Sequence, residues 1–370
     1  MWTRQNIQKI ILDFSLKASN NPFNGVASLY KTDNADWKDD MGLDSIELMQ
    51  LATYINLFFN LFEMKDPPYL LSSNKLDDWV ELVFDAKQKS NEYLNFTTSG
   101  TSGQSKTIKH SIDYLEREVS FLASLFSEAT HIIPYVPSYT IYGFLFTVCL
   151  PEKLGIPLRY PSETNWQQVP AKSLIVATPF HWQLLLPVLP EKILHCLGVS
   201  AASPLYDGLY QSITSKNITL TEIYGSTETS GVAYRKNWKD SFSLFPYWEF
   251  INDNNSIAIK DLKSHTVYSL MDDVTQTGYN QFVIVGRKDK EIKIAGILVN
   301  LDYVNTMIRQ LPNIQQCSVS AKAIDNDVKI QASISLYTDG EKERADIKQQ
   351  IRETLLSHER PRIIHFTTST

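Results

Sequence analysis

The sequence of 370 residues has few cysteines, no long hydrophobic run and no excess of positive charge. Its three cysteines, Cys149, Cys196 and Cys317, are far apart and form no CxxC pair, which argues against a disulfide framework and a cysteine-bound metal. No stretch reaches the roughly 20 apolar residues that a membrane span needs, and the N-terminus lacks the pattern of a secretory signal. We therefore expect a cytoplasmic protein without a membrane span.

The charge balance excludes a second class of function. The chain holds 35 Lys and Arg against 41 Asp and Glu, a net charge of -6. General nucleic-acid binders need a basic face, so we expect no nucleic-acid partner. Apolar residues make up 43% of the sequence and charged residues 21%, which is ordinary globular usage. The length allows two or three domains.

Hydrophobic periodicity predicts a helical region at the N-terminal end. Apolar residues recur at helical spacing over residues 4–17, 45–63 and 76–87, and a polar stretch separates the first two segments. Asp66-Pro67-Pro68 ends the second helix. Together these segments predict a small helical bundle over residues 1–90, which is large enough to fold alone.

After residue 90 the pattern changes. Short β-rich runs alternate with helical segments over residues 91–284, and this alternation predicts α/β layering. From residue 285 a smaller set of strands and helices predicts a compact α+β domain that extends to residue 370.

Asp44 and Ser45 stand at the start of the second predicted helix. One interpretation is structural, because Asp44 and Glu47 have the spacing of a capping box. The helices, the polar loop and Gly42-Leu43-Asp44-Ser45 also resemble an acyl or peptidyl carrier protein over residues 1–90. An exposed hydroxyl at a helix N-terminus suits a phosphate-linked group. The resemblance implies that Ser45 carries a 4′-phosphopantetheine arm, which a phosphopantetheinyl transferase would attach.

The most informative stretch is the small polar run at residues 97–107, Thr-Thr-Ser-Gly-Thr-Ser-Gly-Gln-Ser-Lys-Thr. Such a run can be a flexible linker. Its backbone N–H groups and hydroxyls can equally cradle a phosphate, with Lys106 supplying charge. A Walker loop is excluded because Ser105, rather than glycine, precedes Lys106. The run resembles the phosphate loop of the adenylate-forming superfamily, T-S-G-[ST]-T-G-x-P-K, with serine at positions 102 and 105.

Further segments follow in the order of that superfamily. They resemble the lining of the acyl pocket, the adenine-side turn, the Y-G-x-T-E motif, the ribose-binding aspartate and the hinge motif. These segments are Tyr135–Gly143, Ser200–Leu205, Tyr224–Glu228, Asp272-Asp273-Val274 and Gly286–Gly296. Each alone could be an ordinary turn, loop or hairpin. Their shared order identifies the chain as a member of the superfamily over residues 95–300.

The resemblance implies a role for each candidate site residue. Lys106, Thr227 and Glu228 would be catalytic, and Glu228 would also bind Mg2+. Asp289 would be the hinge of the small domain, and Gly296 would line the passage for the thiol. The acid pocket would contain Tyr139, Thr140, Gly143 and Ser200. ATP or AMP would be bound by Thr98, Ser99, Gly100, Thr101, Ser102, Gly103, Tyr224, Gly225, Asp272 and Arg287, with Asp273 as the alternative to Asp272.

Three departures from the superfamily pattern affect the expected activity. Thr140 stands about where the acyl-pocket segment usually has a histidine. Only about 95 residues precede the phosphate loop, where the superfamily has a large subdomain, so the ligase core looks truncated. The segment Arg360–Phe366 aligns with the C-terminal Gly-Lys motif but holds no lysine. Loss of one such cation predicts adenylation slower by roughly 10²–10³-fold unless another chain supplies it.

These observations predict a multidomain chain with a four-helix carrier bundle (1–90), a truncated α/β adenylate-forming core (91–284) and a small α+β domain (285–370). The expected activity is ATP-dependent, AMP-forming activation of an aromatic or fatty carboxylic acid and its transfer to a phosphopantetheine thiol. Its cofactors would be ATP, Mg2+ and 4′-phosphopantetheine, and biosynthetic enzymes would act on the carrier-bound acyl group. The alternatives are a CoA ligase whose helical front is only structural, and a degenerate non-catalytic ligase that acts as a carrier scaffold.

Overall fold

The structure is a computed structural model, and it divides into two compact units. The first unit holds the described residues up to 97, together with residues 107–202 and 213–231. The second holds residues 203–212 and the described residues from 232 onwards. The residues that the structure describes are 2–19, 34–97, 106–253, 256–270, 272–287, 291–294, 297–324 and 327–367.

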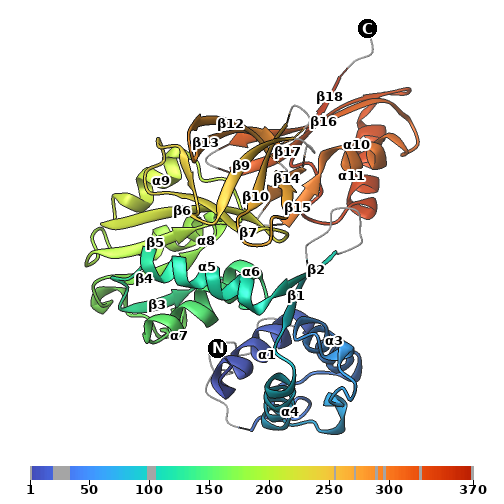
Figure 1. Ribbon diagram of the computed structural model, residues 1–370. Helices are drawn as coiled ribbons and strands as arrows, with labels where there is room; N and C mark the ends of the chain where they lie inside the picture. The colour runs from blue at the N-terminus through green and yellow to red at the C-terminus, as the bar shows by residue number, and fades with distance from the viewer. Residues whose placement is uncertain are drawn as a thin grey trace. The chain divides into compact units, whose positions relative to one another are not determined.

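The first unit opens with three helices whose starts follow from the sequence (Figure 1). Helix α1 spans Arg4–Ala18, and the side chain of Thr3 accepts a hydrogen bond from the backbone N–H of Asn6. Helix α3 spans Ser45–Phe58 and begins with the capping box predicted from Asp44 and Glu47. Helix α4 spans Leu76–Lys89. Helices α1 and α4 end within two residues of the predicted segments, whereas α3 ends at Phe58, five residues before the predicted end at residue 63 and well before Asp66-Pro67-Pro68.

The predicted four-helix carrier bundle is nevertheless wrong. Residues 4–18 contribute a single helix, and the three helices belong to the same compact unit as the α/β core. The ring of Phe58 in α3 lies 5.3 Å from that of Phe96 and 5.8 Å from that of Phe144, both outside the predicted bundle. A carrier closes its apolar faces on itself. Here the helices pack on one another, and Phe58 in addition packs against the strand that holds Phe96 and the helix that holds Phe144.

Polar contacts tie the same helices to the core. Asn95, on strand β1 (Tyr93–Thr97), donates its side-chain amide to the carbonyl of Leu57 at 2.8 Å. The ammonium of Lys87 in α4 lies 3.4 Å from the carbonyl oxygen of Phe59 and 3.3 Å from that of Tyr93. Burial lowers the pKa of Lys87 to about 8. Strand β1 therefore contacts both α3 and α4.

The centre of the first unit is a parallel sheet, which agrees with the predicted α/β layering. Its strands are adjacent in the order in which they occur in the chain, and they are mostly buried; all five residues of β4 are inaccessible. They are β3 (His131–Pro134), β4 (Ser173–Ala177), β5 (Cys196–Ser200) and β6 (Ile218–Ser226). The unit also contains the hairpin β1–β2, in which β2 spans Thr107–Ser111. Its further helices are α5 (Ile112–Leu125), α6 (Ile141–Phe144), η3 (Leu145–Cys149), α7 (Leu150–Leu154) and α8 (Pro179–Leu185).

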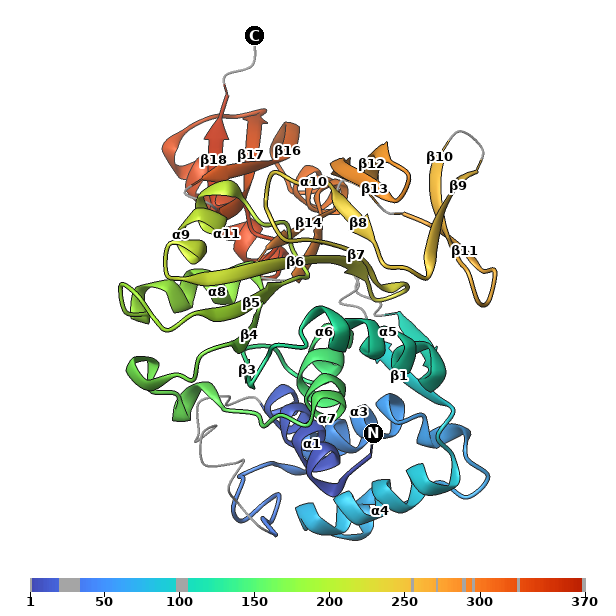
Figure 2. The same cartoon turned by 60° about the vertical axis from the view of Figure 1, so that its left-hand side comes forward.

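The second unit is mainly antiparallel (Figure 2). Helix α9 (Asp207–Thr214) lies across the boundary between the two units. One set of neighbouring strands runs in the order β7 (Ser230–Arg235), β8 (Phe242–Leu244), β13 (Gln281–Arg287) and β12 (Asp272–Gly278). Another sheet consists of β9 (Trp248–Asp253), β10 (Ser256–Asp261) and β11 (Val267–Ser269).

The last part of the second unit has its own apolar core. Thirteen buried side chains between Val299 and Leu355 form one cluster, with partly buried neighbours from Ile292 to Phe366 packed against it. The elements are β14 (Glu291–Ile294), β15 (Ile297–Asn300), α10 (Leu301–Arg309), β16 (Ile314–Ile324), β17 (Asp327–Leu336), α11 (Glu341–Thr354) and β18 (Ile363–Phe366). This is the predicted α+β arrangement, while the domain boundaries at residues 90 and 284 stay predictions.

Among the described residues, no helix is both long and apolar enough to cross a membrane.

Candidate functional site

The Tyr-Gly-Ser-Thr-Glu segment forms the end of β6 and the turn into β7. The turn is held in place by β2 and α5 of the same unit. Nε2 of His110 lies 2.7 Å from the carbonyl oxygen of Thr227, and the hydroxyl of Tyr114 donates to the carbonyl of Thr229 at 2.5 Å. The carboxylate of Glu118 accepts the backbone N–H of Gly231 at 3.0 Å. Glu228 thus sits, half-buried, in a turn with fixed backbone geometry.

Gly225 is required by a close backbone approach. A Cβ at this position would lie 2.0 Å from the carbonyl oxygen of Ser230, far inside van der Waals contact. Because that oxygen belongs to the backbone, no side-chain movement can make room for it. The glycine therefore lets β6 and the following strand approach each other closely at the turn.

The protonation of His110 follows from its surroundings. A carbonyl oxygen can only accept, so Nε2 of His110 carries the proton that it donates to Thr227. Burial lowers the pKa of this imidazole, and the Thr227 carbonyl and the nearby Glu228 charge oppose that change only in part. A neutral His110 therefore fixes the turn next to the candidate Mg2+ ligand.

The predicted acid-pocket segment lies beyond the carboxyl end of β3. Its Tyr142 hydroxyl lies 3.1 Å from the carbonyl oxygens of Ala177 and Val199, at the ends of β4 and β5. Thr140 begins α6 by accepting the backbone N–H of Gly143 at 3.0 Å. A Cβ on Gly143 would lie 1.9 Å from the carbonyl oxygen of Pro137, so this glycine too permits a close approach.

Two further pocket residues lie in the same unit. Ser200 ends β5, is fully buried, and its hydroxyl has no hydrogen-bond partner among the described residues. The strand register pairs it with Glu222, so Tyr224 lies two residues further along β6. Burial raises the pKa of Tyr139 to about 12, which keeps its phenol neutral. The carboxyl ends of parallel strands are where α/β sheets bind ligands.

The predicted ribose-binding pair lies in the second unit. Asp272 is the first residue of β12 and Arg287 the last of β13, and the register makes them direct partners across the two strands. Asp272 is half-buried and Asp273 exposed, and the choice between them for the ribose hydroxyls stays a prediction.

Several predicted residues lie outside the part of the chain that the structure describes. They are Thr98, Ser99, Gly100, Thr101, Ser102, Gly103, Asp289 and Gly296. Lys106 is described and is the exposed residue just before β2. The roles assigned to all of them stay predictions, as does the effect of having no lysine at residues 360–366.

The residues around Glu228 are compatible with Mg2+. Within the described ranges, no group of three or more His, Cys, Asp or Glu side chains could hold a metal ion by itself. Mg2+ rarely needs such a cage, because it keeps several waters and binds one or two carboxylates together with substrate phosphates. A single half-buried carboxylate such as Glu228 suits that mode.

Sequence reasoning missed the side chains that hold the turn. His110, Tyr114 and Glu118 contact residues more than 110 positions away in the chain. One signal was available in α5, where Tyr114 and Glu118 are polar residues one turn apart beside the buried Leu115 and Leu122. Polar groups on a buried helix face need partners.

The fold is an α/β arrangement around a parallel sheet, and in such folds ligands generally bind at the carboxyl edge of the strands. Comparison with known proteins identifies the family. The AMP-binding enzyme family matches residues 62–267, more than half of the 370 residues, so the chain belongs to that family. The match begins inside the region predicted to be a carrier domain.

Curated relatives cover most of the chain. It is 26% identical over 335 residues to a 4-coumarate–CoA ligase of Cereibacter sphaeroides, an alignment covering 87% of this chain and 78% of that one. It is 29% identical over 294 residues to a 4-coumarate–CoA ligase of Rhodobacter capsulatus, covering 75% and 74%.

A solved structure shares the fold. The amide bond synthetase McbA from Marinactinospora thermotolerans superimposes with a TM-score of 0.58 at 15% identity. The alignment covers 74% of this chain and 65% of McbA, so the chain spans about two thirds of that protein's length. The likeness shows that the chain shares the α/β fold of that enzyme.

Proposed function

We propose that this protein is an AMP-forming acid–CoA ligase. In the first step a carboxylate oxygen attacks the α-phosphorus of ATP, a new P–O bond forms, and pyrophosphate leaves. In the second step the CoA thiol loses its proton and attacks the acyl carbon, and AMP leaves with the electron pair of the broken C–O bond. The observation that carries the proposal is the anchored Tyr224–Glu228 turn in a chain of the AMP-binding family.

The residues of the turn have complementary roles in the first step. Glu228 would bind the Mg2+ that neutralises the phosphate oxygens, and Thr227 would contact the α-phosphate. Lys106 and the loop at residues 98–103 would stabilise the departing pyrophosphate by preorganised charge and N–H groups. Asp272, with Arg287 opposite it in the strand register, would accept the ribose hydroxyls.

The remaining predicted residues belong to the second step. Asp289 would be the hinge about which the small domain turns between adenylation and thioester formation, since such steps often gate an enzyme of two half-reactions. Gly296 would line the passage for the pantetheine arm of CoA.

The proposed substrate is an aromatic carboxylic acid of the 4-coumarate kind. Support comes from two curated relatives, each named 4-coumarate–CoA ligase, that align over 75% or more of this chain. The pocket candidates Tyr139, Gly143 and Ser200 combine an aromatic surface, a side-chain-free backbone and a buried hydroxyl. Such a lining suits a flat ring with a polar substituent.

Free CoA is the proposed thiol acceptor because helices α1, α3 and α4 are built into the ligase core. This is the alternative in which the helical front is structural. Ser45 begins α3 beside the Asp44–Glu47 capping box, which accounts for the sequence pattern there. Phosphopantetheine attachment to Ser45, and the transferase and biosynthetic partners that go with it, stay untested predictions.

Acid-dependent exchange between ATP and pyrophosphate tests the proposal. We expect exchange with hydroxycinnamic acids and little with short aliphatic acids. Glu228→Gln should lower the rate about 10²–10³-fold, the typical effect of losing one preorganised electrostatic group. Glu92→Gln, which alters an exposed carboxylate in the same unit, is the matched control. Absence of exchange with every aryl and acyl acid of a broad panel would overturn the proposal.

A further inference from the structure

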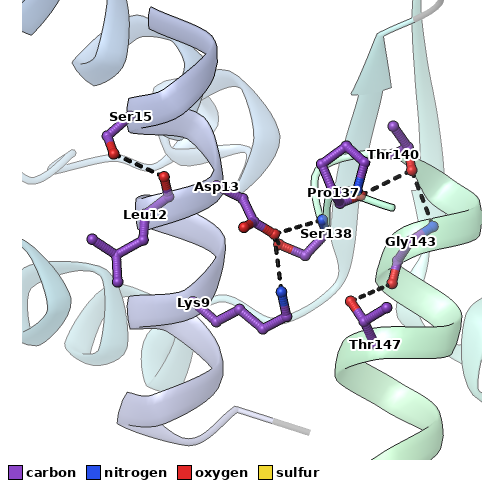
Figure 3. Close-up of polar contacts among 9 residues, drawn as sticks. All are labelled: Lys9, Leu12, Asp13, Ser15, Pro137, Ser138, Thr140, Gly143 and Thr147. Atoms are coloured by element: carbon purple, nitrogen blue, oxygen red, sulfur yellow. Dashed lines mark hydrogen bonds and ion pairs between the residues drawn. The ribbon is translucent and has the colours of Figure 1, made fainter. Parts of the chain in front are cut away.

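A buried ionic network joins α1 to the acid-pocket segment. In α1 the ammonium of Lys9 lies 3.0 Å from Oδ2 of Asp13. The same oxygen accepts the backbone N–H of Ser138 at 2.7 Å and its hydroxyl at 2.5 Å. Figure 3 shows the three side chains converging between the helix and the segment from Pro137 to Gly143.

The burial of this network separates it from ordinary surface ion pairs. The side chains of Lys9 and Asp13 are each 6% exposed, and Ser138 is fully buried. A buried charge pair is tolerated only when its geometry is good and its remaining polar sites are satisfied. The two donors of Ser138 help to meet that requirement for Asp13. The helix and the segment are therefore held in one fixed relation.

Aromatic contacts continue from the ionic network along the segment. The ring of Phe14 stacks on that of Tyr139, with centroids 5.0 Å apart and planes 23° apart. The ammonium of Lys17 lies 5.0 Å from the same Tyr139 ring. Successive residues of α1, Asp13 and Phe14, thus contact successive residues of the segment, Ser138 and Tyr139.

Hydrogen bonds within the segment couple the position of Ser138 to the residues that follow it. The hydroxyl of Thr140 donates to the carbonyl of Pro137 at 3.0 Å and accepts the backbone N–H of Gly143. Two residues after Thr140, the Tyr142 hydroxyl reaches the carbonyl oxygens at the ends of β4 and β5. A displacement at Ser138 would therefore shift Tyr139, Thr140 and Tyr142 together.

We propose that Asp13 is a positioning residue for acid selection. It fixes the Pro137–Gly143 segment through Ser138 and so sets the shape of the pocket for the aromatic acid, while it does not touch ATP. This inference rests on the proposed acid–CoA ligase activity. It makes α1 a determinant of specificity in the ligase itself.

Steady-state kinetics of the full chain distinguish a positioning role of Asp13 from a purely structural one. In Asp13→Asn the amide oxygen still accepts one donor of Ser138, but the buried Lys9 loses its counter-charge. We expect KM for the acid to rise about 10- to 100-fold, the cost of misplacing a binding group by about 1 Å. KM for ATP should change less than about twofold, and discrimination between 4-coumarate and benzoate should weaken.

Two further variants keep the test interpretable. The double variant Lys9→Met/Asp13→Asn removes the positive charge together with the negative one and keeps an amide acceptor, so it should recover part of the KM for the acid. Ser138→Ala removes only the hydroxyl donor and should raise that KM by a smaller factor; it takes the place of Asp13→Asn if that variant fails to fold. The matched control is Ser15→Ala, because in the described part of the chain the buried Ser15 hydroxyl bonds only within α1, to the carbonyl of Leu12 at 2.8 Å.

The outcomes distinguish this inference from the function on which it rests. A wild-type enzyme without acid-dependent exchange overturns the ligase proposal and this inference with it. An active wild type whose Asp13→Asn or Ser138→Ala variant loses kcat, with KM for the acid and acid preference unchanged, overturns only this inference. That pattern would mean that the variant lowers the fraction of folded enzyme and leaves the acid pocket unchanged.

Discussion

The N-terminal helices and the C-terminal part of the chain bury their apolar faces in different ways. Helices α1, α3 and α4 pack within the first unit against residues far away in the sequence, as Phe58 does against Phe144. The C-terminal part forms one cluster entirely from its own residues, between Ile292 and Phe366. An amphipathic pattern shows that a face is buried, but it does not show what that face is buried against.

This difference has an energetic consequence. A segment that shares its core loses most of its buried contacts when it is cut out, whereas a segment with a closed cluster keeps them. Small domains are marginal in any case, so shared burial decides whether a piece can fold alone.

The largest expected effect is on excised fragments. A fragment of residues 1–90 should be unfolded, because its helices lose Phe96, Phe144 and Ser138 as partners. A fragment of residues 285–370 should fold, because it keeps its whole cluster. Amide dispersion in NMR spectra of the two fragments checks this. Cooperative folding of residues 1–90 alone would restore the idea of an independent N-terminal domain.

The next effect concerns two ion pairs of helix α1, one within the helix and one between α1 and α4. Asp13→Ala leaves Lys9 buried without its counter-charge and should cost about 3–5 kcal/mol of unfolding free energy. Arg4→Ala breaks the exposed Arg4–Glu81 pair and should change stability little. Urea denaturation measures both. Equal losses would mean that the Asp13 network contributes no more than a surface pair.

A glycine on strand β6 of the first unit and one in the C-terminal part give a smaller contrast. Gly225→Ala forces a Cβ against the Ser230 backbone, and we expect a loss of about 1–3 kcal/mol together with weakened ATP–pyrophosphate exchange. In the C-terminal part, a Cβ on Gly340 would meet only the flexible end of Glu343, so Gly340→Ala should cost about 1 kcal/mol or less. Thermal unfolding of both variants tests the pair, and a larger loss at Gly340 would contradict it.

The smallest effect is an acid sensitivity of the first unit. Burial lowers the pKa of His110, His131 and His181 below the usual 6.5. The unfolded chain therefore takes up protons first as the pH falls. The contribution of these histidines to stability is fully present above pH 6.5, and it is lost as the pH falls through their lowered pKa values in the folded state. His110→Gln keeps an N–H donor for Thr227 and should reduce the fall in Tm between pH 7 and pH 5. An unchanged fall would remove His110 from this account.

Local structure could be predicted from the sequence because it depends on nearby residues. The helix predicted over residues 4–17 is α1 at Arg4–Ala18, and the α/β alternation predicted over residues 91–284 includes the buried strand β4 at Ser173–Ala177. The capping residues and the glycine at position 225 also lie where their motifs suggested.

The sequence did not predict which residues each buried helix face packs against. Asp13 meets Ser138, 125 residues further along the chain, and no local periodicity encodes that pairing. The same limit explains the mistaken carrier bundle, since three amphipathic helices and a Gly-Leu-Asp-Ser motif fit either arrangement. It also explains why His110 and Tyr114, which hold the Thr227–Thr229 turn, were missed.

The location of the acyl product tests the central claim most directly, namely that the N-terminal helices serve a ligase that uses free CoA. The enzyme is incubated with ATP, Mg2+, 4-coumarate and CoA after treatment with a phosphopantetheinyl transferase. Mass spectrometry then records both the small molecules and the intact chain. The account predicts free coumaroyl-CoA, an unchanged protein mass, and equal rates for wild type and Ser45→Ala. A mass gain at Ser45, with the acyl group attached to the protein and no need for CoA, would contradict it.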